Sequence, residues 1–228
     1  KDFFDGLPKN AFALTNADDK NGAVMLQNTK AKKFTYALKS FADYKARILE
    51  NQITGLQLKI NDKEVWVKLI GDFNAYNLLA IYGVALQLGL DELEVLRLLS
   101  ELESVAGRFQ YFISESGVTA IVDYAHTPDA LENVISTINS IRTNNEQLIT
   151  VVGCGGDRDK FKRPVMAQIA SSLSDKVIFT ADNPRSEDPE VILAEMEKGV
   201  EPHNYKRTVT ILDRKQAIKT ACQMAQPK

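Results

Sequence analysis

The chain has 228 residues, of which 44% are hydrophobic and 25% charged, as in ordinary globular proteins. A net charge of −2 without a long basic run argues against a general nucleic-acid-binding surface. No apolar stretch reaches the roughly 18 residues that span a membrane, so we expect no membrane insertion. Two cysteines without metal-ligand spacing, Cys154 and Cys222, favour a reducing, cytoplasmic setting.

Residues 1–105 carry mixed strand and helix signals. Residues 23–26 and 64–70 are predicted strands, the second because its apolar residues alternate. Residues 71–77 are predicted as a polar loop, which leads into an apolar helix over residues 78–88.

A second helix in this region begins after Asp91, with Glu94 in capping-box spacing. Residues 104–108 then form a short connector. We place a domain boundary there, which separates residues 1–105 from residues 106–228.

The second part alternates regularly between strands and helices. The predicted strands cover residues 118–123, 148–152, 177–181 and 209–212. The predicted helices open at Pro128 after the cap Thr127, at Pro164, at Pro189 after the cap Asp188, and after the cap Asp213. Four such alternations predict an α/β fold with a mostly parallel, Rossmann-like sheet covered on both faces.

Polar, charged and glycine residues follow three of these predicted strands. They occupy residues 123–128, 153–160 and 182–185. In open α/β sheets, ligands bind at the carboxyl ends of the strands. The three segments therefore predict one ligand-binding edge.

The 153–156 turn, Gly-Cys-Gly-Gly, suits close approach of backbone N–H groups to an anion, although a tight connection explains the glycines equally well. The cations that follow are Arg158, Lys160, Lys162 and Arg163, and the planar fork of an arginine fits a carboxylate or phosphate. They are alternatively a solvated helix start. Because cations at a helix start oppose the helix dipole, we favour the functional interpretation.

The 182–185 segment offers several kinds of polar group within four residues. Asp182 suits an ammonium, Asn183 offers an amide, Pro184 stiffens the backbone and Arg185 suits a carboxylate. This combination fits a zwitterion. An Asx-type turn with a surface arginine is the simpler alternative.

Further candidates flank these segments. Asp123 could accept hydroxyl or amine protons, and His126 could contact phosphate or transfer a proton. Asn74 and Asn77 suit either N-capping or an adenine edge, and Arg108 is either a surface charge or a phosphate contact.

The acidic group at residues 16–19 has weak metal-binding potential but is more typical of a solvated loop. We therefore predict no metal site in the chain.

Taken together, these segments resemble the Mur ligase family, and within it the branch that adds meso-diaminopimelate. The resemblance runs along essentially the whole chain and rests on an ordered set of motifs. They lie at residues 16–19, 71–77, 107–109, 123–128, 153–164 and 182–189.

The resemblance implies a fold and a reaction. The family has a UDP-sugar domain, a central ATPase domain and a C-terminal Rossmann-like domain. With ATP and Mg²⁺, the branch phosphorylates UDP-N-acetylmuramoyl-L-alanyl-D-glutamate to an acyl phosphate, which the amine of meso-diaminopimelate then attacks. This is a cytoplasmic step of bacterial peptidoglycan synthesis, required for cell shape and division.

The resemblance also implies residue roles. Arg158, Asp182, Asn183, Pro184 and Arg185 match positions that recognise meso-diaminopimelate.

Nucleotide-contacting positions match in the same way. Asn74 and Asn77 match the adenine-contacting helix start, while Arg108 and Asp123 match contacts formed when the C-terminal domain closes. His126 lies in the same motif with a less defined role.

The resemblance further implies that the chain is a fragment. The P-loop, a modified lysine that helps to hold Mg²⁺ and the UDP-sugar pocket would precede Lys1, and a further amino-acid-binding motif would follow Lys228. We therefore expect no catalytic residue within the chain and no ligation by the chain alone.

Two alternatives stay open. One is another superfamily member, such as a lysine-adding, D-alanyl-D-alanine-adding or folylpolyglutamate synthase-like enzyme. The other is a non-catalytic module that binds a small ligand.

Overall fold

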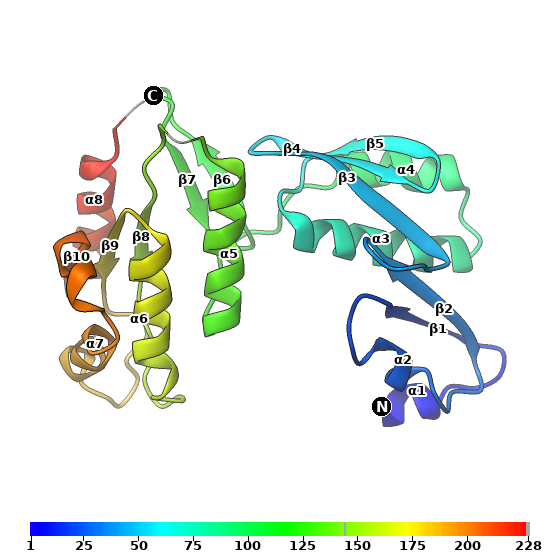
Figure 1. The fold of residues 1–228 in the computed structure, drawn as a ribbon, viewed down its shortest axis with the longest axis horizontal. Coiled ribbons are helices and arrows are strands. Elements are labelled where there is room, and N and C mark those ends of the chain that lie inside the picture. Colours follow the sequence, from blue (N-terminus) through cyan, green and yellow to red (C-terminus); the bar gives the residue numbers. More distant parts are fainter. Residues whose placement is uncertain (144, 227–228) are drawn as a thin grey trace. The chain divides into compact units, whose positions relative to one another are not determined.

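The structure is a computed structural model that describes residues 1–143 and 145–226. The chain divides into two compact units, Lys1–Ser104 and Val105–Lys228, which we call unit 1 and unit 2 (Figure 1). Within the described ranges, no helix combines the length and the apolar character needed to cross a lipid bilayer.

Unit 1, all of whose residues are described, contains a mixed sheet in the order β1-β2-β3-β4-β5. Its strands are β1 (Phe12–Asn16), β2 (Lys32–Ala37), β3 (Tyr44–Gln52), β4 (Gly55–Ile60) and β5 (Lys63–Val67). Its helices are α1 (Asp2–Asp5), α2 (Gly22–Met25), α3 (Asp72–Gln87) and α4 (Glu92–Glu101). The first three strands pair in parallel, and β3, β4 and β5 pair in antiparallel.

The core of unit 1 lies between this sheet and helix α3, which contacts β1, β2, β3 and β4. In β4, Leu56, Leu58 and Ile60 alternate toward the core and are fully buried. From α3, Leu78 and Leu79 pack into the same core.

Two predictions for unit 1 were wrong and two were confirmed. Residues 23–26 fall mostly in α2 instead of a strand, because four apolar residues are too few to distinguish the two periods. The polar loop predicted over residues 71–77 is the first part of α3, whose polar residues lie toward solvent. The predicted strand at 64–70 is confirmed over its first residues as β5. The Asp91 cap is also confirmed, since its carboxylate accepts from the Glu94 N–H at 3.0 Å.

Unit 2, over residues 105–143 and 145–226, contains a parallel sheet in the order β10-β9-β8 and an antiparallel hairpin of β6 and β7. Its strands are β6 (Gln110–Ile113), β7 (Thr119–Val122), β8 (Ile149–Val152), β9 (Lys176–Phe179) and β10 (Thr208–Thr210). Its helices are α5 (Pro128–Ile141), α6 (Lys162–Leu173), α7 (Pro189–Glu197), the 3-10 helix η1 (Pro202–Arg207) and α8 (Arg214–Met224).

The fold class is confirmed, since unit 2 alternates strands and helices around a parallel sheet. Helices α5 and α6 lie side by side, and α6 and α8 both contact β9 (Figure 1). The core joins Val177 and Phe179 of β9 to Met166, Ala167 and Ala170 of α6.

One strand pairs differently from the prediction. The strand predicted at residues 118–123 is β7, and in the described residues its ladder is with β6 and not with the parallel sheet. The turn between β6 and β7 closes through a hydrogen bond from the Gly117 N–H to the Ser114 carbonyl at 2.9 Å. A local hairpin and a parallel strand have the same apolar pattern, so the sequence did not separate them.

The predicted helix caps are confirmed. Thr127 accepts from the Ala130 N–H at 3.3 Å, Asp188 from the Glu190 N–H at 2.8 Å and Asp213 from the Gln216 N–H at 2.6 Å. Helix α6 begins at Lys162, two residues before the predicted Pro164.

Candidate functional site

Two of the predicted strand-end segments, the 153–156 turn after β8 and the 182–185 turn after β9, are joined directly. The Gly156 N–H donates to the Asn183 carbonyl at 2.9 Å. In return, Nη1 of Arg185 donates to the Gly156 carbonyl at 2.6 Å. The structure thus brings two of the three predicted segments together at the carboxyl edge of the parallel sheet, while the third, residues 123–128, follows β7 of the β6–β7 hairpin.

The glycines of the first turn permit this close contact. A Cβ atom on Gly153 would lie 2.2 Å from the Thr180 carbonyl oxygen, and one on Gly156 would lie 1.9 Å from the Pro184 carbonyl oxygen. Both positions therefore exclude any side chain. Of the two interpretations of these glycines, this packing supports the tight connection.

A buried ion-pair network lies beside the two turns. The Arg163 side chain is fully buried and pairs with Glu187 at 2.8 Å and Glu195 at 2.6 Å. Glu187 also pairs with Lys160 at 3.0 Å and accepts from the Asp157 N–H at 2.6 Å. Two of the cations that the sequence analysis assigned to function, Arg163 and Lys160, therefore have structural partners.

This network shifts a carboxyl pKa. Hydrogen bonds from Arg163, from the Asp157 N–H and from Lys160 lower the pKa of Glu187 to about 2. The Glu187 carboxyl is therefore ionised at neutral pH.

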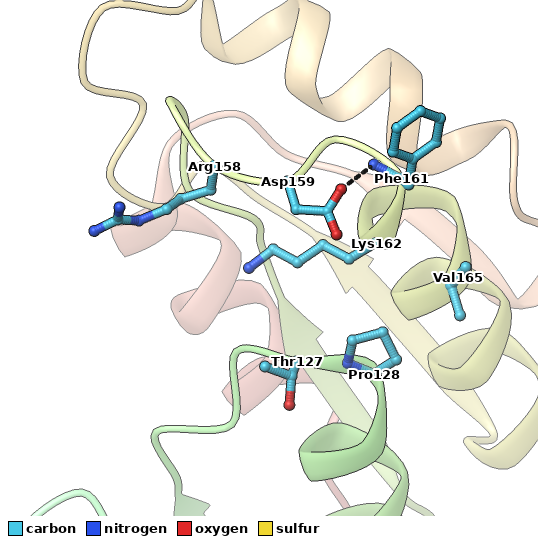
Figure 2. Close-up of a pocket in the computed structure, with 7 residues that line it drawn as sticks. All are labelled: Thr127, Pro128, Arg158, Asp159, Phe161, Lys162 and Val165. Carbon is cyan, nitrogen blue, oxygen red and sulfur yellow. Dashed lines mark hydrogen bonds between the residues drawn. The ribbon is translucent and has the colours of Figure 1, made fainter.

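Arg158 lines a hollow of about 460 Å³ between the start of α5 and the start of α6 (Figure 2). Lys162 also lines the hollow, and its Nζ donates to the His126 carbonyl at 2.7 Å. Figure 2 shows the ring of Phe161, which is 87% exposed, pointing away from Lys162. Among the described residues Arg158 has no hydrogen-bond or ion-pair partner, so its guanidinium is available to a ligand.

A second hollow, of about 620 Å³, lies at the ends of β9 and β10. Asp182, Asn183 and Pro184 line it together with Arg214, the first residue of α8. Of the candidate amino-acid residues, Arg158 lines the first hollow and residues 182–184 line the second, whereas Arg185 lines neither.

Arg214 was missed by the sequence analysis. Its Nε donates to the Ala181 carbonyl at 2.8 Å, and its Nη2 lies 3.5 Å from Oδ1 of Asp182. The sequence did carry a signal, because a cation at the first position of a helix opposes the helix dipole.

The candidate nucleotide residues of unit 2 gather around an aromatic ring that the sequence analysis also missed. The Arg108 guanidinium lies over the Tyr124 ring, 4.6 Å from its centroid, and the His126 ring packs edge-on against it at 4.9 Å. Nδ1 of His126 is 3.0 Å from the Tyr124 carbonyl. Tyr124 is 60% exposed, so this cluster lies at the surface.

Asp123 holds the backbone beside this cluster. Its Oδ2 accepts from the Phe109 N–H at 2.7 Å and its Oδ1 from the Ala125 N–H at 2.7 Å. Phe109 has a left-handed backbone with φ 47°, which is uncommon for a non-glycine residue. Asp123 therefore stabilises a strained residue directly after Arg108, and each of its oxygens keeps one lone pair for a ligand.

In unit 1, neither candidate asparagine caps α3. Nδ2 of Asn74 donates to the Ile70 carbonyl at 2.8 Å, and Nδ2 of Asn77 donates to Oδ1 of Asn74 at 3.2 Å. The N-capping interpretation was therefore wrong. The Asn77 side chain is exposed at the start of α3, which leaves its amide oxygen open to a ligand.

The acidic group at residues 16–19 is structural. Asp18 accepts from the N–H groups of Leu38, Lys39 and Ser40 and from the Tyr76 hydroxyl, at 2.8–2.9 Å. Burial alone would raise the pKa of Asp18, but hydrogen bonds, Ser40's foremost, outweigh it and hold the pKa well below its usual range. Among the described residues, no three His, Cys, Asp or Glu side chains gather closely enough to hold a metal ion.

Similar proteins share this sequence over nearly its whole length. The UDP-N-acetylmuramoyl-L-alanyl-D-glutamate–2,6-diaminopimelate ligase of Phocaeicola vulgatus is 57% identical over 100% of this chain and 47% of its own. The ligase of the same name from Cytophaga hutchinsonii is 54% identical over 98% of this chain and 46% of its own. The chain therefore spans about half the length of the curated relatives it matches.

Two solved structures are also similar to this chain. One of a ligase with the same name as these relatives has a TM-score of 0.63 and 36% identity, over 95% of this chain and 46% of that one. The UDP-N-acetylmuramoylalanyl-D-glutamyl-2,6-diaminopimelate–D-alanyl-D-alanyl ligase from Acinetobacter baumannii has a TM-score of 0.73 at 15% identity, over 96% of this chain and 47% of its own. At this identity the likeness is one of fold alone.

Family comparisons cover both units. Residues 1–85 match the "Mur ligase middle domain" and residues 107–228 match the "Mur ligase, glutamate ligase domain". The second match alone covers more than half of the chain. This chain belongs to the Mur ligase family.

Proposed function

We propose that this chain is part of an ATP-dependent ligase that adds meso-diaminopimelate to UDP-N-acetylmuramoyl-L-alanyl-D-glutamate in bacterial peptidoglycan synthesis, a cytoplasmic reaction. Two relatives that are named for this activity are 54% and 57% identical in sequence to this chain, which supports the proposal. The whole reaction requires more of the protein than these residues.

The observation that carries the proposal is the 182–185 turn. Asp182 and Asn183 line a hollow, where a carboxylate and an amide suit the ammonium groups of an amino acid. Arg185 uses Nη1 on the Gly156 carbonyl, which leaves the other donors of its fork for a carboxylate. Meso-diaminopimelate carries two carboxylates where lysine has one, so an additional arginine favours the former.

Arg158 is the second cation that we assign to the amino acid. It lines the neighbouring hollow, and its side chain is exposed without a partner among the described residues. An exposed guanidinium without a partner can turn toward a carboxylate with little loss of free energy, because no existing ion pair has to break.

For the nucleotide, each unit supplies candidates. In unit 1 we assign the adenine edge to the exposed amide of Asn77, oriented by Asn74. In unit 2 we assign phosphate contact to Arg108 and His126, and hydroxyl or amine contact to Asp123. Stacking on Tyr124 keeps the Arg108 guanidinium extended at the surface, where an anion can reach it.

In the proposed reaction, ATP phosphorylates the D-glutamyl carboxylate, and the amine of meso-diaminopimelate attacks the acyl phosphate and displaces phosphate. The residues described here bind and orient the amine-bearing substrate and the nucleotide.

The test is a ligase assay on the intact enzyme that contains this chain, with meso-diaminopimelate and L-lysine compared as substrates. We expect a strong preference for meso-diaminopimelate. We expect Arg185→Ala to raise the KM for meso-diaminopimelate by about 10- to 100-fold, the cost of losing hydrogen bonds to a charged group.

The matched control is Arg207→Ala, because Arg207 is an exposed arginine of η1 that lines neither hollow. This variant should leave the KM for meso-diaminopimelate and the KM for L-lysine unchanged. Equal or better use of L-lysine by the unmodified enzyme would refute the proposed specificity.

A further inference from the structure

We propose that Arg214 is a positioning residue for Asp182 and that it sets the affinity of the enzyme for the incoming amino acid. The inference rests on the proposed function, because it assigns a role within the amino-acid site. It starts from the placement of Arg214 at the first position of α8, where a cation opposes the helix dipole. The helix itself therefore gains nothing from this arginine.

The contacts of Arg214 lie on the neighbouring strand ends. Its Nε donates to the Ala181 carbonyl at 2.8 Å, which holds the peptide unit that leads into Asp182. Its Nη2 lies 3.5 Å from Oδ1 of Asp182, a distance that is electrostatic more than a hydrogen bond. The same Nη2 would lie 3.1 Å from a Cβ atom on Gly153, so the guanidinium also lies against the end of β8.

Arg214 is not needed to hold these strand ends together. Backbone bonds already join them, since the Ala181 N–H donates to the Leu212 carbonyl at 3.2 Å and the Ile211 N–H to the Phe179 carbonyl at 2.9 Å. The hydroxyl of Thr180 adds a further bond to the Leu212 carbonyl at 3.3 Å. The guanidinium therefore contributes orientation and charge at Asp182 beyond what the fold requires.

Both side chains remain available to a ligand. The Asp182 side chain is 46% exposed and that of Arg214 is 47% exposed, and both line the hollow of about 620 Å³ with Asn183. The guanidinium lies beside Oδ1 of Asp182, which leaves Oδ2 available to an ammonium group of the substrate. An ammonium and a carboxylate of one amino acid would meet charges of both signs in this hollow.

The experiment measures steady-state KM for meso-diaminopimelate, KM for ATP and kcat in the intact ligase that contains this chain. The variants are Arg214→Met, Arg214→Lys, Asp182→Asn and the double variant Arg214→Met with Asp182→Asn. Lys215→Met is the matched control, because Lys215 is the adjacent exposed cation and has no partner in the described part of the chain.

We expect Arg214→Met to raise the KM for meso-diaminopimelate by about tenfold, with the KM for ATP unchanged within twofold. Arg214→Lys should raise it by less, since an ammonium keeps the charge but lacks the planar fork that reaches both Ala181 and Asp182. If Arg214 acts through Asp182, Arg214→Met should add less than twofold in the Asp182→Asn background.

The outcomes separate the two proposals. If Asp182→Asn raises the KM for meso-diaminopimelate while both Arg214 variants leave it unchanged, the positioning role is refuted and the proposed function stands. If Arg214→Met raises the KM for ATP equally, or lowers kcat alone, the effect is a general structural one and the positioning role is also refuted. If the unmodified enzyme does not use meso-diaminopimelate, the proposed function itself fails.

Discussion

At the level of single residues, the candidate site depends on close contacts that a larger side chain or a lost charge would disrupt. Gly156 lies against the Pro184 carbonyl, and Glu187 joins two cations and a backbone N–H beneath the turns. These residues bind no ligand in our proposal. They hold the backbone from which Arg158 and Arg185 extend.

Gly156→Ala tests the contact between the two turns. The added Cβ would lie 1.9 Å from the Pro184 carbonyl oxygen, so the backbone must shift. We expect a loss of about 2 kcal/mol in the free energy of unfolding, measured by urea titration. Gly117→Ala is the control, because its Cβ meets open space and the only cost is the left-handed φ of 85°, about 1 kcal/mol. Equal losses in the two variants would contradict the contact.

The lowered pKa of Glu187 predicts a pH dependence of stability. Its pKa is about 2 in the folded protein and 4.5 ordinarily, so its contribution is complete above pH 4.5 and is lost as the pH falls toward 2. We expect Glu187→Gln to flatten the fall in unfolding temperature between pH 4.5 and pH 2, followed by circular dichroism. Glu190→Gln, at an exposed carboxyl of α7, should retain the wild-type slope. Parallel curves for Glu187→Gln and wild type would exclude this linkage.

At the scale of elements, the helices of unit 2 begin where a cap and a proline coincide. Thr127 caps α5 and Pro128 occupies its first turn, and the same pairing recurs at Asp188 and Pro189 of α7. Thr127 also lines the first hollow. The cap therefore fixes one wall of the candidate site as well as the start of the helix.

Thr127→Ala removes the oxygen that accepts from the Ala130 N–H. We expect a loss of about 1 kcal/mol in unfolding free energy, because one N–H at the helix start loses its partner. Thr127→Ser keeps that oxygen and should lose less than half as much. Chemical denaturation of the two variants decides the matter, and identical losses would show that the methyl group and not the cap is responsible.

At the scale of the whole molecule, the two units have separate hydrophobic cores. Leu78 is fully buried in the core of unit 1, and Phe179 is fully buried in that of unit 2. Each core is formed by residues of its own unit, so a cavity in one removes contacts only there.

We therefore expect Leu78→Ala and Phe179→Ala each to cost about 3 kcal/mol within one unit. Hydrogen exchange read by mass spectrometry should show faster exchange in peptides of residues 1–104 for the first variant and of residues 105–226 for the second. Each variant is the other's control. Loss of protection in both units from one substitution would mean that the units unfold as a single cooperative body.

The comparison of sequence and structure shows which kinds of feature can be predicted. The caps at Asp91, Thr127 and Asp213 were predicted correctly, because each depends on residues within one helical turn. The start of α3 was missed because several of its first residues are polar and lie toward solvent. A run of polar residues is also typical of a loop. Residues 23–26 failed because a short apolar run fits a helix or a strand equally well.

The residues and their spacing were enough to predict the family, the alternation of strands and helices in unit 2, and the residue types at the carboxyl edge of its sheet. The pairing of β7 with β6, the burial of Arg163 and the approach of Arg214 to Asp182 became known only from the folded chain. The two groups of features differ in how far apart along the chain the interacting residues lie. Caps and periodicity act between residues close along the chain, whereas these contacts join side chains from separate elements, and only the packing of the sheet brings those elements together.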